Sequence, residues 1–464
     1  MAMSFKNLKF DLKKIPLYLF LATSLSSTAE TFTSTNIEPY QPGSIVLEPF
    51  RYIPPPSAAD ADHNKIQRKP EEQKIVDLYA AGKYREAGLN GLELLENEKP
   101  DDALKLIMAN SLAWTGQTAN AKKIYQEISE PKLIDDANLG VANILRWQGH
   151  DHLAAPIFRD ILERRPDSSD VQTGLLLAER ELAPRTLIGV AGIQDSGDFS
   201  LNSGVINHRW RGNNGYTITE IELGAIKDTL PTVGAQQNEV TLRHQDLALQ
   251  LKPAFEISLP KTSGNSNSKI YGNLKLTFDD DKIRVGLGRV NWGRMANNAE
   301  SLRQDFSADY IGANIKREFY FGEIAGRLDY YKISDGNVIV SGGLRLNSNL
   351  RPLGAKIRPI VGVDIRKSKF NTPNYWSPAD GHGNIYAGLE GDWAVEQWAV
   401  YGGAQFGLPA YGEAGTSWSL SAGAKRWLTD DVAFSFNLWS MASVRAGVTY
   451  RSQSANMMLE RFWR

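Results

Sequence analysis

Cysteine is absent from the 464 residues of this sequence. Secreted eukaryotic domains usually contain disulfides, whereas bacterial envelope proteins manage without them, so the absence favours the second class. It also excludes attachment to lipid through an N-terminal cysteine. Beyond the N-terminus no apolar run reaches about 18 residues, which excludes a helical integral membrane protein. The mean hydropathy of −0.35 is compatible with a transmembrane β-barrel, because polar lumen-facing residues dilute the apolar signal of its strands.

A strong charge of either sign is also missing. The net charge is −1 and the pI is about 6.6, so no nucleic acid or other polyanion is implied as a partner. His150 and His152 lie at a repeat turn, where we expect solvated loop residues. The acidic run 279–281 fits a tight turn better than a calcium site. Because no nucleophile motif, phosphate loop or metal-ligand spacing is found, we expect no enzyme activity, no catalytic residue, no metal and no cofactor.

The N-terminal part has the composition of an export signal followed by a linker. Residues 1–29 combine several lysines with a short apolar core and a small-residue cleavage site, as a secretory signal peptide does. Residues 30–70 are rich in proline among polar residues, which predicts an extended linker without a core of its own. The signal places the mature protein beyond the inner membrane.

Residues 71–182 contain an internal repeat with a spacing of 33 or 34 residues. The segments LYAAGKYREA, LAWTGQTANA and LRWQGHDHLA align at a glycine, at an alanine five residues later, and at a proline that closes each unit. Glycine between two helices, alanine at their contact and proline at the end form the tetratricopeptide pattern. Such units bury their apolar faces by stacking. The sequence therefore predicts a short α-solenoid, in the periplasm, that docks other molecules.

From residue 186 to residue 464 the periodicity changes from helical to alternating. We find sixteen alternating segments of about ten residues, and the clearest pair spans 384–408 with Glu396 and Gln397 as its turn. One face of this hairpin is apolar, with Trp393 and Trp398 near its end. The sequence thus predicts a multidomain α+β protein, an α-solenoid followed by an antiparallel transmembrane β-barrel of about 16 strands in the bacterial outer membrane.

The lengths of the connections support this prediction. Outer-membrane barrels alternate long outer loops with short periplasmic turns, and most connections here follow that rule, whereas 334–336 and 349–355 do not. The long connections are predicted at 197–202, 228–237, 262–268, 292–307, 369–382 and 409–415.

The faces opposite the apolar ones should line a pore, because a charged residue facing lipid costs roughly 2–4 kcal/mol at the bilayer midplane. They carry charges of mixed sign among aromatic residues, which suits a neutral or weakly charged sugar chain better than a polyanion. A second interpretation is that these side chains fill and cross-link the barrel interior. The candidate residues of a polymer path are Arg327, Asp329, Tyr331, Arg358, Asp364, Arg366, Tyr386, Glu390, Asp392, Tyr401, Gln405, Lys425, Trp427 and Trp439.

The predicted outer loop 369–382 carries a group of large polar and aromatic residues. It contains Tyr375, Trp376 and Asp380 within the stretch YWSPAD. Such a loop either folds inward as a constriction or covers the barrel rim, and the sequence leaves both alternatives open.

The order of signal, solenoid and barrel resembles the exopolysaccharide-export outer-membrane proteins. These include the cellulose-export subunit, the poly-N-acetylglucosamine export porin and YaiO-like outer-membrane proteins. The resemblance covers nearly all of 71–464 and is carried by the repeat 145–166, the YWSP loop and the closing stretch 418–439. Two features depart from it: the solenoid is shorter than in cellulose-type exporters, and Arg464 follows the terminal aromatic residues.

The resemblance implies a passive conduit that guides a secreted polysaccharide across the outer membrane. It further implies that an inner-membrane synthase pushes the polymer and that the solenoid docks the synthase or periplasmic modifying proteins. Two alternatives remain: a translocator of surface lipoproteins or other proteins, similar to the surface lipoprotein assembly modifiers, and a general porin or phage receptor.

Overall fold

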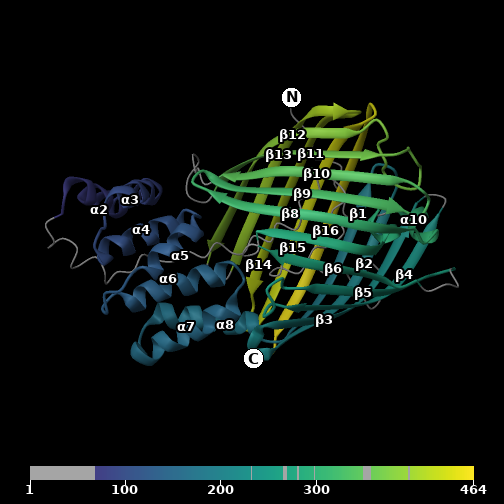
Figure 1. Ribbon diagram of the computed structural model, residues 1–464. Helices are drawn as coiled ribbons and strands as arrows, with labels where there is room; N and C mark the ends of the chain where they lie inside the picture. Colours follow the sequence, from purple (N-terminus) through teal and green to yellow (C-terminus); the bar gives the residue numbers. More distant parts are fainter. Residues whose placement is uncertain are drawn as a thin grey trace.

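The computed structural model describes residues 68–230, 233–264, 269–278, 282–296, 298–348, 357–395 and 398–464. The predicted signal peptide, the acidic run 279–281 and the turn residues Glu396 and Gln397 lie outside these ranges, as does the predicted linker up to residue 67. Within them a helical region precedes a closed antiparallel β-barrel (Figure 1).

Seven α-helices form the N-terminal region of the described chain. They are α2 (Pro70–Ala80), α3 (Tyr84–Asn97), α4 (Asp102–Trp114), α5 (Thr118–Gln126), α6 (Ile134–Trp147), α7 (Asp151–Arg164) and α8 (Ser169–Leu182). Each helix packs against its neighbour in sequence, so the helices form a stack. Not one helix of the described ranges is long and apolar enough to cross a membrane.

The aligned glycines end the first helix of each repeat. Gly82, Gly116 and Gly149 have φ angles of 71°, 83° and 76°, a left-handed conformation that favours glycine. In each unit the N–H of the following residue donates to a carbonyl oxygen five residues earlier, at 2.8, 2.9 and 2.8 Å, as in a Schellman motif. The three aligned alanines are fully buried between helices. Three successive turns thus share one geometry, as the repeat predicts.

A partly buried carboxylate closes the repeat formed by α4 and α5. Asp102, at the start of α4, accepts hydrogen bonds from the backbone N–H groups of Ser129 and Glu130, both at 2.7 Å, and pairs with Lys105 at 3.0 Å. Burial alone would raise the pKa of Asp102, but these hydrogen bonds and the Lys105 cation hold it at about 2. The charged carboxylate therefore fastens the segment after α5 to α4.

Sixteen antiparallel strands form the closed barrel. They are β1 (Arg185–Asp195), β2 (Ser200–Gly212), β3 (Thr217–Thr229), β4 (Gly234–Asp246), β5 (Ala254–Thr262), β6 (Tyr271–Phe278), β7 (Ile283–Asn291), β8 (Ser307–Phe319), β9 (Gly322–Ile333), β10 (Val338–Ser348), β11 (Ile357–Ser368), β12 (His382–Val395), β13 (Trp398–Gly412), β14 (Ala414–Trp427), β15 (Val432–Arg445) and β16 (Val448–Phe462). Neighbours in sequence pair with one another, and β1 pairs with β16 to close the sheet.

Alternating exposure distinguishes the two faces of the barrel wall over much of its described length. On β12, Ile385 and Leu389 are exposed, whereas Tyr386 and Glu390 are buried. Leu408 of β13 is in register with Ile385, so the apolar residues of the two strands share the outer face. The predicted hairpin and its sidedness are confirmed.

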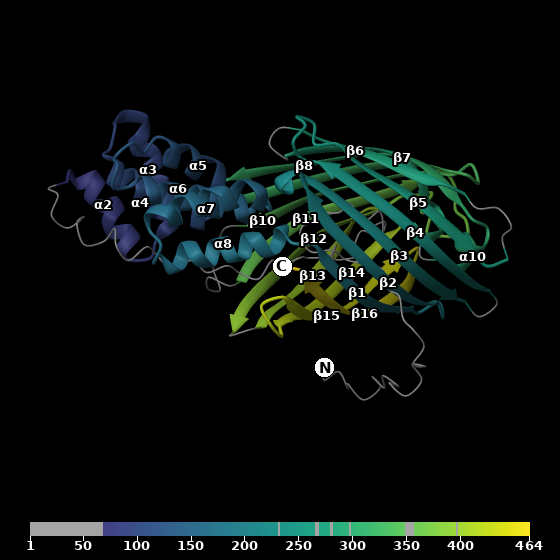
Figure 2. The same cartoon turned by 90° about the horizontal axis from the view of Figure 1, so that it is seen from below.

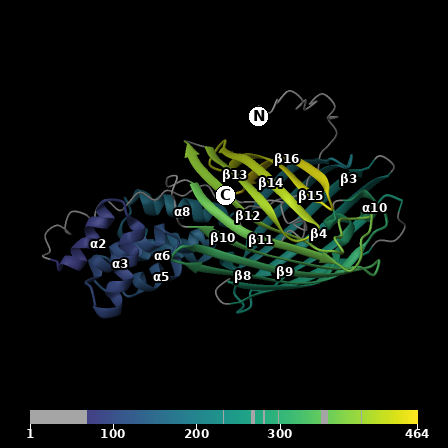
Figure 3. The same ribbon diagram turned by 90° about the horizontal axis from the view of Figure 1, so that it is seen from above.

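The longest connections lie at the barrel end opposite the helices. One of them spans 292–306 and contains α9 (Trp292–Met295) and α10 (Ala299–Arg303); α10 lies at the end remote from α2–α8 in all three views (Figures 1, 2 and 3). The other long connection at this end spans 369–381.

Three of the predicted long loops are wrong. The expected loop 409–415 shrinks to Glu413, and the connections expected at 197–202 and 228–237 shrink to 196–199 and 230–233. The physical reason is that strands continue to pair beyond the lipid-facing belt, where their outer residues no longer need to be apolar. Alternation of hydrophobicity therefore ends before the strand does.

The solenoid contacts the opposite end of the barrel. His152 of α7 is only 4% exposed and packs edge-to-face on Tyr216, with 4.7 Å between ring centroids, next to the turn η2 (Asn213–Gly215). Thr118 of α5 donates a hydrogen bond to Glu318 of β8 at 2.7 Å. The expectation that His152 is solvated is therefore wrong, because the repeat turn is covered by the barrel.

Candidate functional site: the barrel interior

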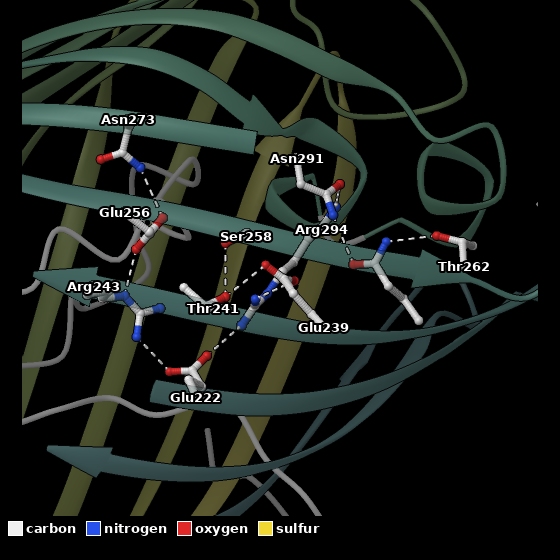
Figure 4. Close-up of polar contacts among 11 residues, drawn as sticks. Glu222, Glu239, Thr241, Arg243, Glu256, Ser258, Thr262, Asn273, Asn291 and Arg294 are labelled. Carbon is white, nitrogen blue, oxygen red and sulfur yellow. Dashed lines mark hydrogen bonds and ion pairs between the residues drawn. The ribbon is translucent and has the colours of Figure 1, made fainter. Parts of the chain in front are cut away.

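A network of ion pairs crosses the interior face of β3, β4 and β5 (Figure 4). Arg243 contacts Glu222 at 2.8 Å and Glu256 at 2.6 Å. Arg294, which comes from α9, contacts Glu239 at 2.6 Å and Glu222 at 3.4 Å. Among the described residues these carboxylates do not form a metal site. Each carboxylate is held by a guanidinium, so the network cross-links the barrel wall to the inward-folded connection.

The connection 292–306 lies inside the barrel mouth. Besides Arg294, it is held by Asn291, whose amide donates to Gln237 of β4 at 2.9 Å. Ala299 and Leu302 of α10 are fully buried against the apolar interior residues of β2, β3 and β4 near the same end. The connection therefore reaches from β7 across the mouth to the wall formed by β2–β4, which narrows the lumen.

The second long connection is joined to the first. Tyr375 packs edge-to-face on Trp292, with 5.4 Å between ring centroids, and its hydroxyl donates to Asp335 at 2.7 Å. Burial and this hydrogen bond raise the pKa of Tyr375, so its hydroxyl stays protonated as a donor. Ser301 of α10 donates to the carbonyl oxygen of Asn374 at 2.5 Å. Tyr375 therefore anchors one loop to the other.

Trp376 points into the barrel from the same loop. Its ring lies 4.9 Å from the Arg366 guanidinium and 4.2 Å from that of Arg445, and its carbonyl oxygen accepts a hydrogen bond from Arg366 at 3.0 Å. Arg366 and Arg445 lie on the interior faces of β11 and β15. Of the two alternatives for this loop, inward folding is the one observed, while Asp380 is exposed on the loop.

Predicted interior charges on β9–β12 form two clusters. Glu390 bridges Arg345 at 2.5 Å and Arg358 at 2.9 Å. Arg327 pairs with Asp329 at 3.0 Å. These contacts match the interpretation in which charged side chains cross-link the wall.

The remaining candidates on these strands occupy the same interior face. Tyr331 lies beside Asp329 on β9 but is buried against Trp292 of the inward loop, with 5.2 Å between ring centroids. Asp364 is half-buried on β11, and Asp392 is half-buried on β12 near the solenoid end.

Two predicted tyrosines lie flat against the wall, each over a glycine of a neighbouring strand. Tyr386 is in register with Gly362, and Tyr401 is in register with Gly423. A Cβ atom added at Gly362 would lie 2.3 Å from the Tyr386 hydroxyl, and one added at Gly423 would lie 2.4 Å from the Tyr401 ring. Glycine at these positions is what allows each ring to lie along the strand rather than across the lumen.

The interior wall of β13–β16 is nearly uncharged. Asn437 accepts a hydrogen bond from the Tyr401 hydroxyl and donates one to Asn456 at 2.7 Å. In these four fully described strands, interior charge is confined to Arg445 near the loop end and to the Lys425–Glu460 pair, at 2.8 Å, near the solenoid end. Between them lie Gln405, Ser417, Ser419, Ser421, Ser435, Trp439, Ser443, Ser452 and Ser454, of which Trp439 packs beside Tyr386 and Met441.

Trp427 is covered by the solenoid. The guanidinium of Arg180, in α8, lies 3.5 Å from the centroid of the Trp427 ring, and Phe462 packs on the same ring at 5.7 Å. The structure thus separates Trp427 from Trp439, which the sequence grouped in one path. Trp427 joins the two parts of the molecule.

The Glu222–Arg243–Arg294 network was not predicted. A signal for part of it exists, because the stretch TEIELG (219–224) alternates glutamate with apolar residues. Arg294 had no such signal: its place in the interior depends on the inward fold of a long connection, which sequence spacing does not describe.

Comparison with known proteins finds a similarity of fold. No protein-family description matches the sequence, and no curated protein matches it. Among solved structures the chain is similar to a bacterial polysaccharide outer membrane secretin, with a TM-score of 0.50 and 12% identity over 61% of this chain and 99% of that chain. The chain shares the barrel fold of that outer-membrane protein. The fold that the sequence resemblance implied is confirmed.

Two further similarities have lower scores. They are to OccK11 (OpdR) of Pseudomonas aeruginosa, with a TM-score of 0.35, 9% identity and coverage of 61% of this chain and 96% of that chain, and to CdiB from Acinetobacter baumannii, with a TM-score of 0.37, 10% identity and coverage of 60% of each chain.

Proposed function

We propose that this outer-membrane barrel is a conduit for an exopolysaccharide that is uncharged or weakly charged. The observation that carries the proposal is the interior wall of β13–β16, which presents hydroxyl, amide and aromatic groups along its length with charge confined near its two ends. Sugar hydroxyls exchange hydrogen bonds with such groups, and sugar faces stack on aromatic rings.

The distribution of charge supports an uncharged polymer over a polyanion. Anion-selective pores present rings of lysine or arginine to the permeating ion. Here Arg243, Arg294, Arg345 and Arg358 each lie within 3 Å of a glutamate oxygen. Cations that are engaged in this way cross-link the wall and attract a polyanion weakly. Conduction requires binding that is weak and repeated along the path, and a row of serines and asparagines provides it.

The solenoid supports a periplasmic entrance at the barrel end that it contacts. The long, inward-folded connections lie at the other end, where outer-membrane barrels have their outer loops. In this arrangement the concave face of the stacked repeats collects the polymer or docks the synthase and modifying proteins that deliver it. Arg180 on Trp427 and His152 on Tyr216 hold that platform to the entrance.

Deletion of the gene, with two separate readouts, tests the proposal. In a deletion strain with a demonstrably active synthase, extracellular polysaccharide should fall and periplasmic polymer should accumulate, while surface lipoproteins remain displayed. Complementation with the intact chain should restore secretion. Unchanged extracellular polysaccharide would contradict the proposal, and a selective loss of surface lipoproteins would support the translocator alternative.

A further inference from the structure

A row of basic residues crosses the outer surface of β7–β11 near the loop end of the barrel. Arg289 of β7 is in register with Asp309 of β8, and Asp309 is in register with Lys332 of β9. Lys332 is in register with Val338 of β10, and the backbone N–H of Lys369, just after β11, donates to the carbonyl oxygen of Val338. The row therefore runs sideways across five neighbouring strands.

A second lysine of β11 belongs to the same patch. Lys367 is exposed and is in register with Val340, two residues from Val338 on the same face of β10. We call the set Arg289, Lys332, Lys367 and Lys369 the basic row.

The basic row begins where the apolar belt ends. Arg289, Lys332 and Lys367 each follow by two residues an exposed apolar residue on the same face: Leu287, Tyr330 and Ile365, with exposed fractions of 47%, 41% and 46%. Two residues advance a strand by about 7 Å. The cations therefore lie one side-chain layer beyond the lipid-facing residues, at the level where the headgroups of the outer leaflet begin.

Asp309, in register between Arg289 and Lys332, balances one of the four positive charges of the row. Arg289 lies 3.9 Å from Asp309 and donates to Ser307 at 3.1 Å. Lys332, Lys367 and Lys369 are exposed, and none of the three has an ion pair or a side-chain hydrogen bond within the described part of the chain. Lys332 and Lys369 flank Val338 at two strand spacings, or about 10 Å. Like charges repel each other, and an anion bound between them relieves this repulsion.

The remainder of the rim differs from this sector. Lys227 of β3 lies at a similar level on the outer face, but its neighbours in register are Asn202 and Gln236. Arg451 of β16 is in register with Ala442 of β15. Lys261 of β5 is a further exposed cation of this rim, in register with Asn238, two residues from Gln236. The strands β3–β5 thus carry two such cations, whereas β7–β11 carry four.

We propose that the basic row binds the phosphate groups of an outer-leaflet glycolipid, a lipid A headgroup. Ammonium and guanidinium groups are good ligands for phosphate oxygens, and clustered lysines at a membrane surface bind anionic headgroups. The occupant is a lipid rather than a free anion because the exposed apolar residues beside and below the row, Val340, Tyr330 and Ile365, offer a surface for its acyl chains. This inference does not rest on what the lumen transports.

Native mass spectrometry of the purified full-length protein tests the site. The intact protein, the double variant Lys332→Gln/Lys367→Gln and the control Lys227→Gln/Arg451→Gln would be titrated with bisphosphorylated lipid A and with the same lipid after removal of its phosphates. Both variants remove two cations from exposed outer-surface positions, so they match in net charge. The retained heat-modifiable migration of each variant would show that its barrel is folded.

The row variant should bind bisphosphorylated lipid A roughly 10- to 30-fold more weakly than the intact protein, because it lacks two lysines and each contributes up to about 5-fold near an anionic surface. The control variant should change less than about 3-fold, and the dephosphorylated lipid should bind the intact protein no better than it binds the row variant. Equal losses in both variants, or equal binding of the two lipids, would overturn the proposal. Full displacement of lipid A by inorganic phosphate at equal concentration would also overturn it, because the site would then be one for free anions.

Discussion

Replacing Arg294 with glutamine should release the inward-folded connection 292–306 from the barrel wall. Arg294 has a side chain that is 15% exposed and pairs with Glu239 at 2.6 Å and Glu222 at 3.4 Å. Glu222 retains Arg243 at 2.8 Å after the substitution, whereas Glu239 loses its cation in the network. The substitution therefore leaves one carboxylate inside the barrel without a positive partner.

The expected magnitude follows from the cost of breaking such a pair. Removing one partner of a buried ion pair costs about 3–5 kcal/mol. Because a membrane channel is partly hydrated and Glu222 remains paired, we expect about 2–3 kcal/mol, or roughly a 30- to 150-fold rise in the equilibrium constant for undocking of the connection. The undocked state removes α9 and α10 from the mouth, so channel conductance should rise.

Single-channel recording in planar bilayers measures this equilibrium as the fraction of time spent at high conductance. Arg303→Gln is the matched control, because Arg303 lies on the same connection but pairs with Glu300 at the surface, with 54% of its side chain exposed. Such surface pairs contribute about 0.2–1 kcal/mol, so the control should shift the equilibrium less than roughly 5-fold. Equal conductance changes in both variants, or no change in Arg294→Gln, would show that Arg294 does not hold the connection 292–306 against the barrel wall.

Three further predictions concern the solenoid. Trp427→Ala should make the solenoid more sensitive to limited proteolysis because Arg180 loses a contact of about 0.5–2 kcal/mol. Trp427→Phe should retain most of the resistance. Equal sensitivity of both variants would contradict a role of the Arg180–Trp427 contact in holding the solenoid to the barrel. Ala121→Leu should destabilise the stack by about 1–3 kcal/mol in thermal unfolding because that alanine is fully buried, and Ala119→Leu, at an exposed site, should not. Asp102 has a folded pKa of about 2, and the unfolded state binds its proton more tightly. Its stabilisation of the solenoid should therefore be complete above about pH 4 and lost as the pH falls through 2. Circular dichroism of Asp102→Asn should show a weaker acid transition, and an unchanged transition would contradict this role of Asp102.

The architecture was predictable because each part has its own period. The hairpin predicted at 384–408 lies within β12 and β13, since apolar residues there alternate along its length. The three glycines of the repeat have to adopt a left-handed conformation, and this need is visible in the sequence as a fixed spacing. Periodicity reports what faces lipid or a neighbouring helix, and both of these environments are uniform along the chain.

The interior site was less predictable because it depends on contacts between distant segments. Trp427 has the same alternation as Trp439, yet one contacts the solenoid and the other the interior of β12–β16. Arg294 lies in a connection where no period applies. Its role depends on where that connection folds, and only the closed barrel brings it to Glu239.

The central claim is that a polysaccharide passes along the interior of β13–β16, and crosslinking from inside the barrel tests it most directly. A photoreactive amino acid would replace Tyr401, on the interior face, or the adjacent Val400, which is 40% exposed on the lipid-facing side. During active secretion, irradiation should attach polysaccharide to the chain at position 401 and not at position 400. Polymer secretion without any adduct at 401, or an adduct at 401 that consists of protein, would contradict the account.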